Sequence, residues 1–258
     1  MPLFIAFRAN NPSNELSVIS SGDGFSWTTR KSYPNIQIGS APAMAVFGGK
    51  LYIAFQANDS SHTLFVTSST DGVNFPTAQA YPNIQIGSAP IMYFQDAHDP
   101  IVENDPPIEA ILYIAFQAND SSHRLFVTSS ATGAGFPTAE PYPDIHIGST
   151  PAVDVSPASY PTMAFQADDP SNRLFFTYSA NENFVVWLSP AREVPGIQIG
   201  SAPALANFGG KLFIAFEAND PSHRLFTAYM TGFEDWVSPA NPIPGVEIGS
   251  APAMASFR

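Results

Sequence analysis

The phrase Ile-Gly-Ser-Ala-Pro at residues 38–42 recurs at 86–90, 147–151, 199–203 and 248–252, with threonine in place of alanine in the third copy. A second phrase, Ala-Phe-x-Ala followed by two Asn or Asp residues, occurs at 6–11, 54–59, 115–120, 164–169 and 215–220. Each phrase therefore occurs five times, in alternation. Repetition with a period of about 50 residues is typical of propellers, solenoids and other repeat architectures.

The spacing of the first phrase divides the chain into units that close on themselves. Cutting before each serine gives units 40–87, 88–148, 149–200 and 201–249, which are 48, 61, 52 and 49 residues long. The remainder, 250–258 together with 1–39, also has 48 residues if the two ends of the chain join. A linear solenoid would need capping units at its ends. The closure therefore predicts a single domain over 1–258 arranged as a ring.

Each unit reads as four short strands. In 40–87 we expect strands at 41–47, 50–57 and 64–68, followed by a weak outer strand around 76–80, because turn residues separate runs of β-branched and aromatic residues. Five such units fit a small-bladed propeller, in which radial packing leaves only short edges. The predicted fold class is all-β: a five-bladed β-propeller with four-stranded antiparallel blades, in which 250–258 and 1–7 share one blade.

Composition excludes several classes of protein. The 25 prolines of the 258 residues are spread along the chain and would break long helices, so a helical bundle is excluded. There is no cysteine, and the net charge of −12 comes with only 10 dispersed basic residues. Phosphate binding needs a concentrated basic face, so nucleic acid and anionic membranes are poor partners. No signal peptide or membrane span is evident, and we expect a soluble protein without a leader and without a cofactor.

In blade count, unit length and terminal closure the chain resembles the five-bladed β-propeller lectins of the tachylectin-2 type. The segments 21–27 and 69–75, Ser-Gly-Asp-Gly-Phe-Ser-Trp and Ser-Thr-Asp-Gly-Val-Asn-Phe, also resemble the Asp-box turn of sialidase-type propellers, although they lack the residue between Asp and Gly. Degenerate forms stand at 131–133, 180–182 and 231–233. The Asp-box is a folding device in its family, so this resemblance implies a propeller and not catalysis. The lectin resemblance implies N-acetylated sugars such as N-acetylglucosamine as ligands.

The strongest candidate binding residues lie in the turn between the second and third strands. Asn, Asp, Pro and Ser are ordinary turn residues, but a turn does not require an imidazole or guanidinium at a fixed offset. An amide, a carboxylate and an arginine together can hold sugar hydroxyls. The predicted sugar-binding residues of this turn are Asn10, Asn11, Asn58, Asp59, His62, Asn119, Asp120, His123, Arg124, Asp168, Asp169, Arg173, Asn219, Asp220, His223 and Arg224.

A second set occupies one position in the connection from the fourth strand to the next unit, between two aliphatic residues. It consists of Gln37, Gln85, His146, Gln198 and Glu247, which either bind ligand or cap the strand. Tyr33, Tyr81 and Tyr142 are expected to wedge between blades rather than stack on a sugar. Trp27, Phe75, Phe136, Trp187 and Trp236 follow the Asp-box-like turn on the opposite face and are expected to anchor the core.

Two features occur once. The third unit carries an insertion at 95–109, whose acidic oxygens could bind calcium, but a solvated loop is favoured because no ligand-loop spacing is present. Asp154 stands on a first strand where other units have Ala45, Tyr93, Ala206 and Ala255, and could line a central channel. No metal site is predicted, since the three loop histidines lie in different blades.

Glycoside hydrolysis needs two carboxylates in different roles, and hence different residues from different blades. The candidate polar residues instead repeat at nearly equivalent positions. Repetition suits a binding protein, because equal weak sites on one face gain avidity. The sequence therefore predicts a non-catalytic, multivalent lectin and hemagglutinin that binds glycans. The alternatives are a glycoside hydrolase or sialidase-like propeller enzyme, or a protein-interaction scaffold.

Overall fold

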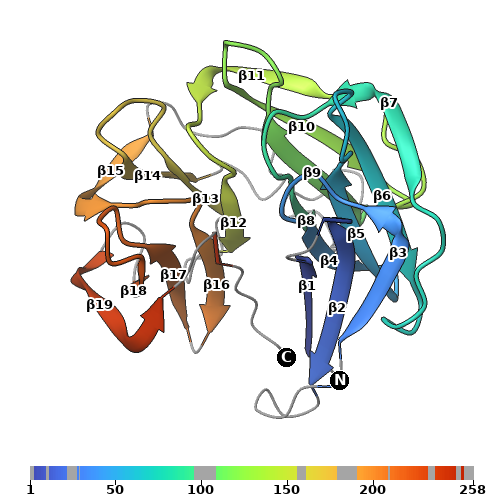
Figure 1. Cartoon of the computed structure of the whole chain (residues 1–258). Helices are drawn as coiled ribbons and strands as arrows, with labels where there is room; N and C mark the ends of the chain where they lie inside the picture. Colours follow the sequence, from blue (N-terminus) through green and yellow to red (C-terminus); the bar gives the residue numbers. More distant parts are fainter. Residues whose placement is uncertain are drawn as a thin grey trace, which may run out of the picture. The chain divides into compact units, whose positions relative to one another are not determined.

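The computed structural model describes residues 3–9, 12–21, 28, 30–95, 109–155, 161–178, 191–208, 210–231, 236–247 and 251–252. These residues contain nineteen strands and no helix, and the strands form five antiparallel sheets (Figure 1). The predicted fold class is confirmed: the chain is all-β and has the fold of a five-bladed β-propeller.

The first two sheets consist of consecutive strands in order. The first contains β1 (Leu3–Arg8), β2 (Glu15–Ser21) and β3 (Lys31–Gln37). The second contains β4 (Ala43–Phe47), β5 (Lys50–Gln56), β6 (Thr63–Ser69) and β7 (Gln79–Gln85). The predicted closing strand at 250–258, which would complete the first sheet, lies outside the described residues apart from Ala251 and Pro252.

The remaining three sheets have four strands each. The third contains β8 (Ile91–Gln95), β9 (Ile111–Gln117), β10 (Arg124–Ser130) and β11 (Glu140–His146). The fourth contains β12 (Ala152–Val155), β13 (Pro161–Gln166), β14 (Arg173–Tyr178) and β15 (Arg192–Gln198). The fifth contains β16 (Ala204–Phe208), β17 (Lys211–Glu217), β18 (Arg224–Met230) and β19 (Trp236–Glu247).

The chain divides into two compact halves. The N-terminal half comprises Met1–Ser121 and Phe126–Pro141, and the C-terminal half comprises Ser122–Leu125 and Tyr142–Arg258. In the N-terminal half, the first strands of adjacent sheets, β4 and β8, are neighbours. In the C-terminal half, β12 neighbours β16, and β15 neighbours β19.

The phenylalanine of the second repeated phrase forms an aromatic pair within its sheet. Phe55 lies opposite Phe65 in the register of β5 and β6, with ring centroids 5.7 Å apart and an interplanar angle of 10°. The pair Phe216 and Phe226 on β17 and β18 has the same arrangement, at 5.9 Å and 14°. Cross-strand aromatic pairs of this kind stabilise a sheet and fix its register.

The fourth strand of each unit differs from the prediction. In the second sheet it covers Gln79–Gln85 rather than 76–80, and a register shift falls between Thr63 and Leu64 of its partner β6. The reason is burial: Tyr81 and Ile84 point into the core while the residues around them are exposed. The proline within this strand is tolerated because it lies at the sheet edge. The residues predicted to lie in connections, such as Gln85, are therefore the last residues of these strands.

The Ile-Gly-Ser phrase joins one sheet to the next through the main chain. Ile38 forms an isolated bridge with Ala57, and the amide of Gly39 donates to the carbonyl of Gln56 at 2.8 Å. The same bond runs from Gly87 to Gln117 in the N-terminal half, and from Gly148 to Gln166 and from Gly200 to Glu217 in the C-terminal half. A Cβ on these glycines would collide with the backbone of the facing Ala, for example 2.7 Å from the carbonyl oxygen of Ala218 at Gly200. Only glycine allows the two backbones to approach this closely.

Two of the predicted tyrosine wedges are confirmed within the N-terminal half. The Tyr33 ring lies edge-on to Phe75 at 5.4 Å, and its hydroxyl donates to the carbonyl of Val73. Tyr81 meets Phe136 in the same way at 5.3 Å. Phe75 and Phe136 therefore serve as core anchors, as expected. Trp27 and Trp187 lie outside the described residues, and Trp236 begins β19.

The Asp-box-like turn after β6 holds itself together. Asp71 accepts hydrogen bonds from the amides of Val73 and Asn74, both at 2.8 Å, and from the Ser69 hydroxyl at 2.7 Å. These bonds, chiefly the one from the Asn74 amide, hold the pKa of the Asp71 carboxyl well below its usual range. Asp71 thus acts within its own turn.

Candidate functional site: a groove between the fourth and fifth sheets

The turn between the second and third strands of each unit contains one residue in a left-handed backbone conformation. The residues with this positive φ, between 49° and 51°, are Asn14, His62, His123, Asn172 and His223. Asn and His are among the non-glycine residues that tolerate this conformation best. The backbone itself therefore gives a reason for a histidine at a fixed offset, which the sequence argument had assigned to ligand binding.

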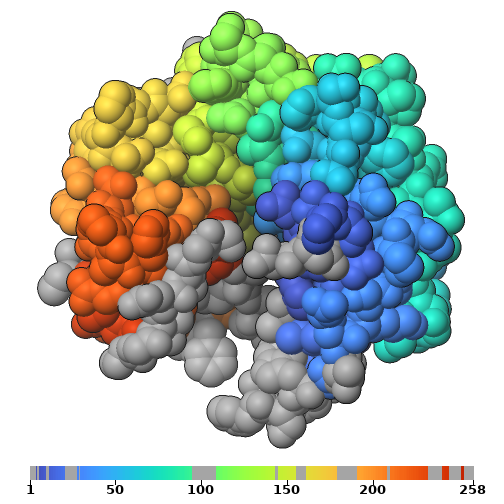
Figure 2. Space-filling view, viewed as in Figure 1, coloured from blue at the N-terminus to red at the C-terminus, as the bar shows by residue number. Residues whose placement is uncertain are grey.

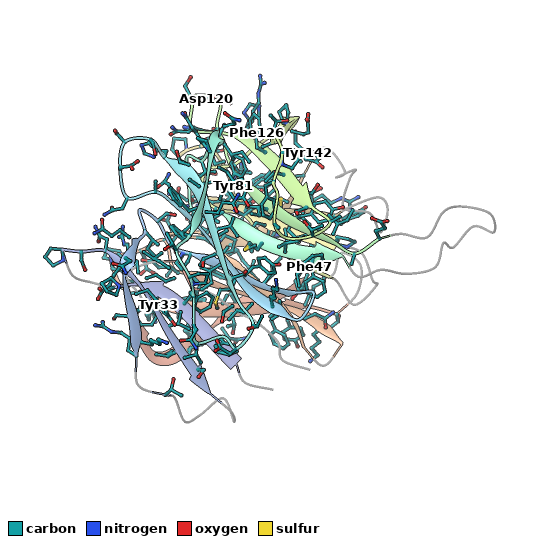
Figure 3. All side chains as sticks on the ribbon, turned by 90° about the vertical axis from the view of Figure 1, so that its right-hand side faces the viewer. Tyr33, Phe47, Tyr81, Asp120, Phe126 and Tyr142 are labelled. Atoms are coloured by element: carbon teal, nitrogen blue, oxygen red, sulfur yellow. The ribbon has the colours of Figure 1, made fainter. Side chains whose placement is uncertain are left out.

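The aspartate in the second position of the Asn/Asp pair bonds to its own loop. Asp59, Asp169 and Asp220 each accept a hydrogen bond at 2.8 Å from the amide of the serine two residues later. That serine lowers the pKa of each of these carboxyl groups, mainly through a hydrogen bond from its side chain and also through the one from its backbone amide. Asp120 lies in the equivalent loop of the third unit, at the opposite end of the strands from Phe47 (Figure 3).

The left-handed residue also reaches the next sheet. Asn14 donates to Asn58 at 3.4 Å, and Asn172 donates to Asn219 at 3.4 Å. His123 Nδ1 lies 2.9 Å from the Asp168 carboxylate. His62 and His223 instead contact the last residue of their own second strand, Gln56 at 3.0 Å and Glu217 at 2.5 Å. Several predicted sugar-binding residues are thus engaged with each other.

One groove brings residues from both predicted sets together within the C-terminal half. It has a volume of about 590 Å³ and lies between the fourth and fifth sheets, whose surfaces adjoin in Figure 2 (yellow and orange). Its lining combines Arg173, Glu193, Gly196, Ile197 and Gln198 from the fourth sheet with Phe216, Ala218, Asn219, Asp220, Phe226 and Ala240 from the fifth. Of these, Arg173, Gln198, Asn219 and Asp220 were predicted as binding residues from the sequence.

Arg173 is held in place on several sides. Its Nε donates to the Ser171 hydroxyl at 2.8 Å, and one terminal nitrogen lies 3.5 Å from Asp169. The guanidinium stands 5.4 Å from the centre of the Phe175 ring. The other terminal nitrogen donates to Glu193 at 2.7 Å, a charge-assisted bond at the groove wall. A guanidinium fixed in this way fixes the carboxylate that it binds.

Glu193 is the functional candidate that the sequence argument missed. It occupies the second position of β15, where the fourth strands of the first three units carry Ser32, Ala80 and Pro141. The carboxylate therefore occurs in the fourth unit and has no counterpart in the first three. Comparing the four strands position by position, instead of searching for repeated polar residues, would have revealed it. Glu193 and Asp220 place two carboxylates from two different sheets in one groove.

The other predicted residues lie elsewhere. Gln37 and Gln85 are exposed ends of the fourth strands, and His146 Nδ1 donates to the Ser122 carbonyl at 2.7 Å. Asn10 and Asn11 lie outside the described residues, and for Glu247 only the strand position is described, opposite Arg224. Asp154 accepts from the Asn207 amide at 2.8 Å and so bridges β12 to β16.

The groove offers no cluster of metal-binding side chains. Across the described ranges, no group of three His, Cys, Asp or Glu residues is arranged to hold a metal ion. The described part of the chain also contains no helix that is long and apolar enough to cross a membrane. The insertion considered for calcium binding, 95–109, is described only at its two ends.

No protein-family model matches this chain, and no curated protein matches it. Solved structures do. A family 43 arabinoxylan arabinofuranohydrolase from Bacillus subtilis, in complex with cellotetraose, is similar with a TM-score of 0.56 and 14% identity over 80% of this chain and 52% of that chain. An exo-β-1,3-galactanase from Clostridium thermocellum has a TM-score of 0.55 and 14% identity over 78% and 47%. An α-L-arabinofuranosidase from the same organism has a TM-score of 0.54 and 12% identity over 77% and 71%.

These likenesses establish the fold, and the chain spans about half the length of the first two enzymes. They also correct the functional prediction. The structures named are glycoside hydrolases, not lectins, which contradicts the predicted non-catalytic, multivalent lectin. The resemblance to tachylectin-2-type and Asp-box proteins, and N-acetylglucosamine as ligand, gain no support from them.

The physical reason for the error is visible in the groove. The sequence argument preferred a lectin to an enzyme because its candidate polar residues repeat. The second carboxylate of this groove does not repeat, since Glu193 has no acidic counterpart in the first three units. Repetition described the turns, while the exception to the repeat lies in the candidate site.

Proposed function

We propose that this chain binds a neutral oligosaccharide in the groove between the fourth and fifth sheets and hydrolyses a glycosidic bond there. The observation that supports this function is the presence of two carboxylates, Glu193 and Asp220, from different sheets in one groove. Glycoside hydrolysis uses such a pair on opposite sides of the scissile bond. The fold likeness to glycoside hydrolases supports the same class of reaction.

The remaining lining suits a sugar. The partly exposed Phe226, stacked on the buried Phe216, offers an apolar surface to the C–H face of a pyranose or furanose ring. Gln198 and Asn219 supply amide donors and acceptors for hydroxyl groups. A groove of about 590 Å³ lies within the range of about 300–1,000 Å³ that is usual for ligand sites.

The two carboxylates differ in their surroundings. Hydrogen bonds from Ser222 lower the pKa of Asp220 and keep it ionised, as the nucleophile or base of a glycosidase must be. Arg173 donates a charge-assisted hydrogen bond to Glu193 at 2.7 Å and holds this second carboxylate at the groove wall.

The charges of the groove define the class of substrate. Its charged lining residues are Arg173, Glu193 and Asp220, which together give a net charge of −1. The one cation among them is already matched by Glu193. An anionic sugar would therefore meet repulsion, and a neutral one would not.

The test is hydrolysis of neutral aryl glycosides (arabinofuranoside, xyloside and galactoside) and of xylotriose, cellotetraose and β-1,3-galactotriose. Glu193→Gln and Asp220→Asn should each lower kcat by about a hundredfold or more. Matched controls are Glu140→Gln, on the exposed start of β11, and Asp59→Asn, which makes the same serine contact outside the groove. Equal activity of Glu193→Gln and Glu140→Gln on a hydrolysed substrate would refute the role of Glu193.

A further inference from the structure

Gly196 occupies a position at which the first two units carry an asparagine. The fourth strands of the first two units end in Tyr-Pro-Asn-Ile-Gln, with Asn35 and Asn83 in the middle, whereas β15 ends in Val-Pro-Gly-Ile-Gln. The fourth unit therefore has no side chain at this position, which lines the groove, and the fifth unit likewise has Gly245 here.

The tyrosine two positions earlier has been lost as well. In the first two repeat units, Tyr33 and Tyr81 fill the space between their own sheet and the next by packing edge-on against Phe75 and Phe136. The fourth unit has the smaller Val194 at this position, fully buried. The core residue that precedes Gly196 by two positions is thus smaller than its counterparts Tyr33 and Tyr81.

The space at Gly196 is open. A Cβ built on this residue has no heavy atom within 4 Å, and its φ of 73° is left-handed. Side chains rarely adopt such a φ, so an asparagine at this position adds backbone strain to the volume of its side chain, and the control must be a glycine with the same φ. A side chain at this position would extend into the volume that a bound oligosaccharide must occupy.

We propose that Gly196 determines which oligosaccharides enter the groove, because the missing side chain is what admits the sugar chain. This inference rests on the proposed function and adds the residue that sets access to the site. Gly196 takes no part in the reaction, so filling its space removes binding and leaves the chemical step intact.

The experiment compares Gly196→Asn with Gly49→Asn. Gly49 is a matched control, because it has a φ of 74°, its Cβ likewise meets nothing within 4 Å, and it lies in the turn between β4 and β5. Binding of xylotriose, cellotetraose and β-1,3-galactotriose is measured by titration calorimetry, and KM and kcat are measured for whichever of them is hydrolysed. Melting temperatures show that each variant is folded, and Gly196→Ser replaces Gly196→Asn if the latter fails to fold.

We expect Gly196→Asn to raise Kd and KM by about tenfold or more with kcat little changed, while Gly49→Asn behaves as the parent chain. Unchanged Kd and KM in folded Gly196→Asn would overturn this inference and leave the proposed function intact. A parent chain that neither binds nor hydrolyses any of these sugars would instead overturn the proposed function, and this inference with it.

Discussion

Replacing Gly87 by alanine should destabilise the chain far more than the added methyl group suggests. Gly87 lies where the second sheet meets the third, and its amide donates to the Gln117 carbonyl at 2.8 Å. A Cβ there would stand 2.9 Å from the carbonyl carbon of Ala118 and closer still to its oxygen. Both atoms belong to a backbone fixed by β9, so the Gly87 segment itself must move away.

The net cost follows from two destabilising terms and one stabilising term. Overpacking against a fixed neighbour costs about 1–3 kcal/mol. Loss of the Gly87 hydrogen bond costs about 0.5–1.5 kcal/mol. The lower entropy of an alanine-containing unfolded chain offsets about 0.4–1 kcal/mol. The midpoint of these ranges is a net loss of about 2 kcal/mol, which for a chain of this size lowers Tm by about 4–8 °C.

The assay is thermal and urea unfolding followed by circular dichroism, with Gly135→Ala as the matched control. A Cβ on Gly135 meets nothing within 4 Å, so this change should stay within about 0.5 kcal/mol of the parent chain. A Gly87→Ala variant as stable as Gly135→Ala would refute the argument that the close approach of two backbones requires glycine in the Ile-Gly-Ser phrase.

Three further outcomes are expected. Tyr33→Phe should lose about 1 kcal/mol in urea unfolding, since it removes the bond to the Val73 carbonyl, whereas Tyr33→Ala should lose about 3–5 kcal/mol because the packing against Phe75 goes too; equal losses would contradict the wedge. Because the pKa of Asp71 is lower in the folded chain than in the unfolded chain, its stabilisation is present above the usual carboxyl pKa and is lost as pH falls below it; Tm of the parent chain should therefore fall more steeply between pH 5 and 2 than Tm of Asp71→Asn, and parallel curves would show that the turn is not held by the ionised carboxylate. Calorimetry should show tighter binding of xylotriose than of a uronic-acid trimer, and the reverse order would contradict the charge balance assigned to the groove.

The fold was predictable because its main determinants repeat. Five copies of two phrases indicated five sheets. Alternation of turn residues with apolar runs located the first three strands of the repeat unit 40–87 to within a few residues. The fourth strand was misplaced because its burial depends on Tyr81 and Ile84, three residues apart, across a shift in register. The two-residue period of a regular strand does not describe this spacing.

The candidate site was predictable only in part, for the same reason. Asp220 and Gln198 repeat and were found, although part of the signal in their loops came from backbone demands, such as the left-handed conformation at His223. Glu193 is an exception to the repeat, and a search for recurring residues passes over it. The ring pair of Phe216 and Phe226 was part of the repeat, but only the three-dimensional arrangement shows that it faces the groove.

The main-chain bond from each Ile-Gly-Ser phrase has a consequence for protein engineering. Because Gly39, Gly87, Gly148 and Gly200 join successive sheets through amide and carbonyl groups, this part of each junction does not depend on which side chains flank it. An exchange of segments between repeats keeps these bonds as long as the glycine stays in place. Grafting Glu193–Gly196 in place of Ala80–Asn83 would therefore keep the Gly87 bond, but it would remove Tyr81 and its packing against Phe136, so that packing would have to be redesigned.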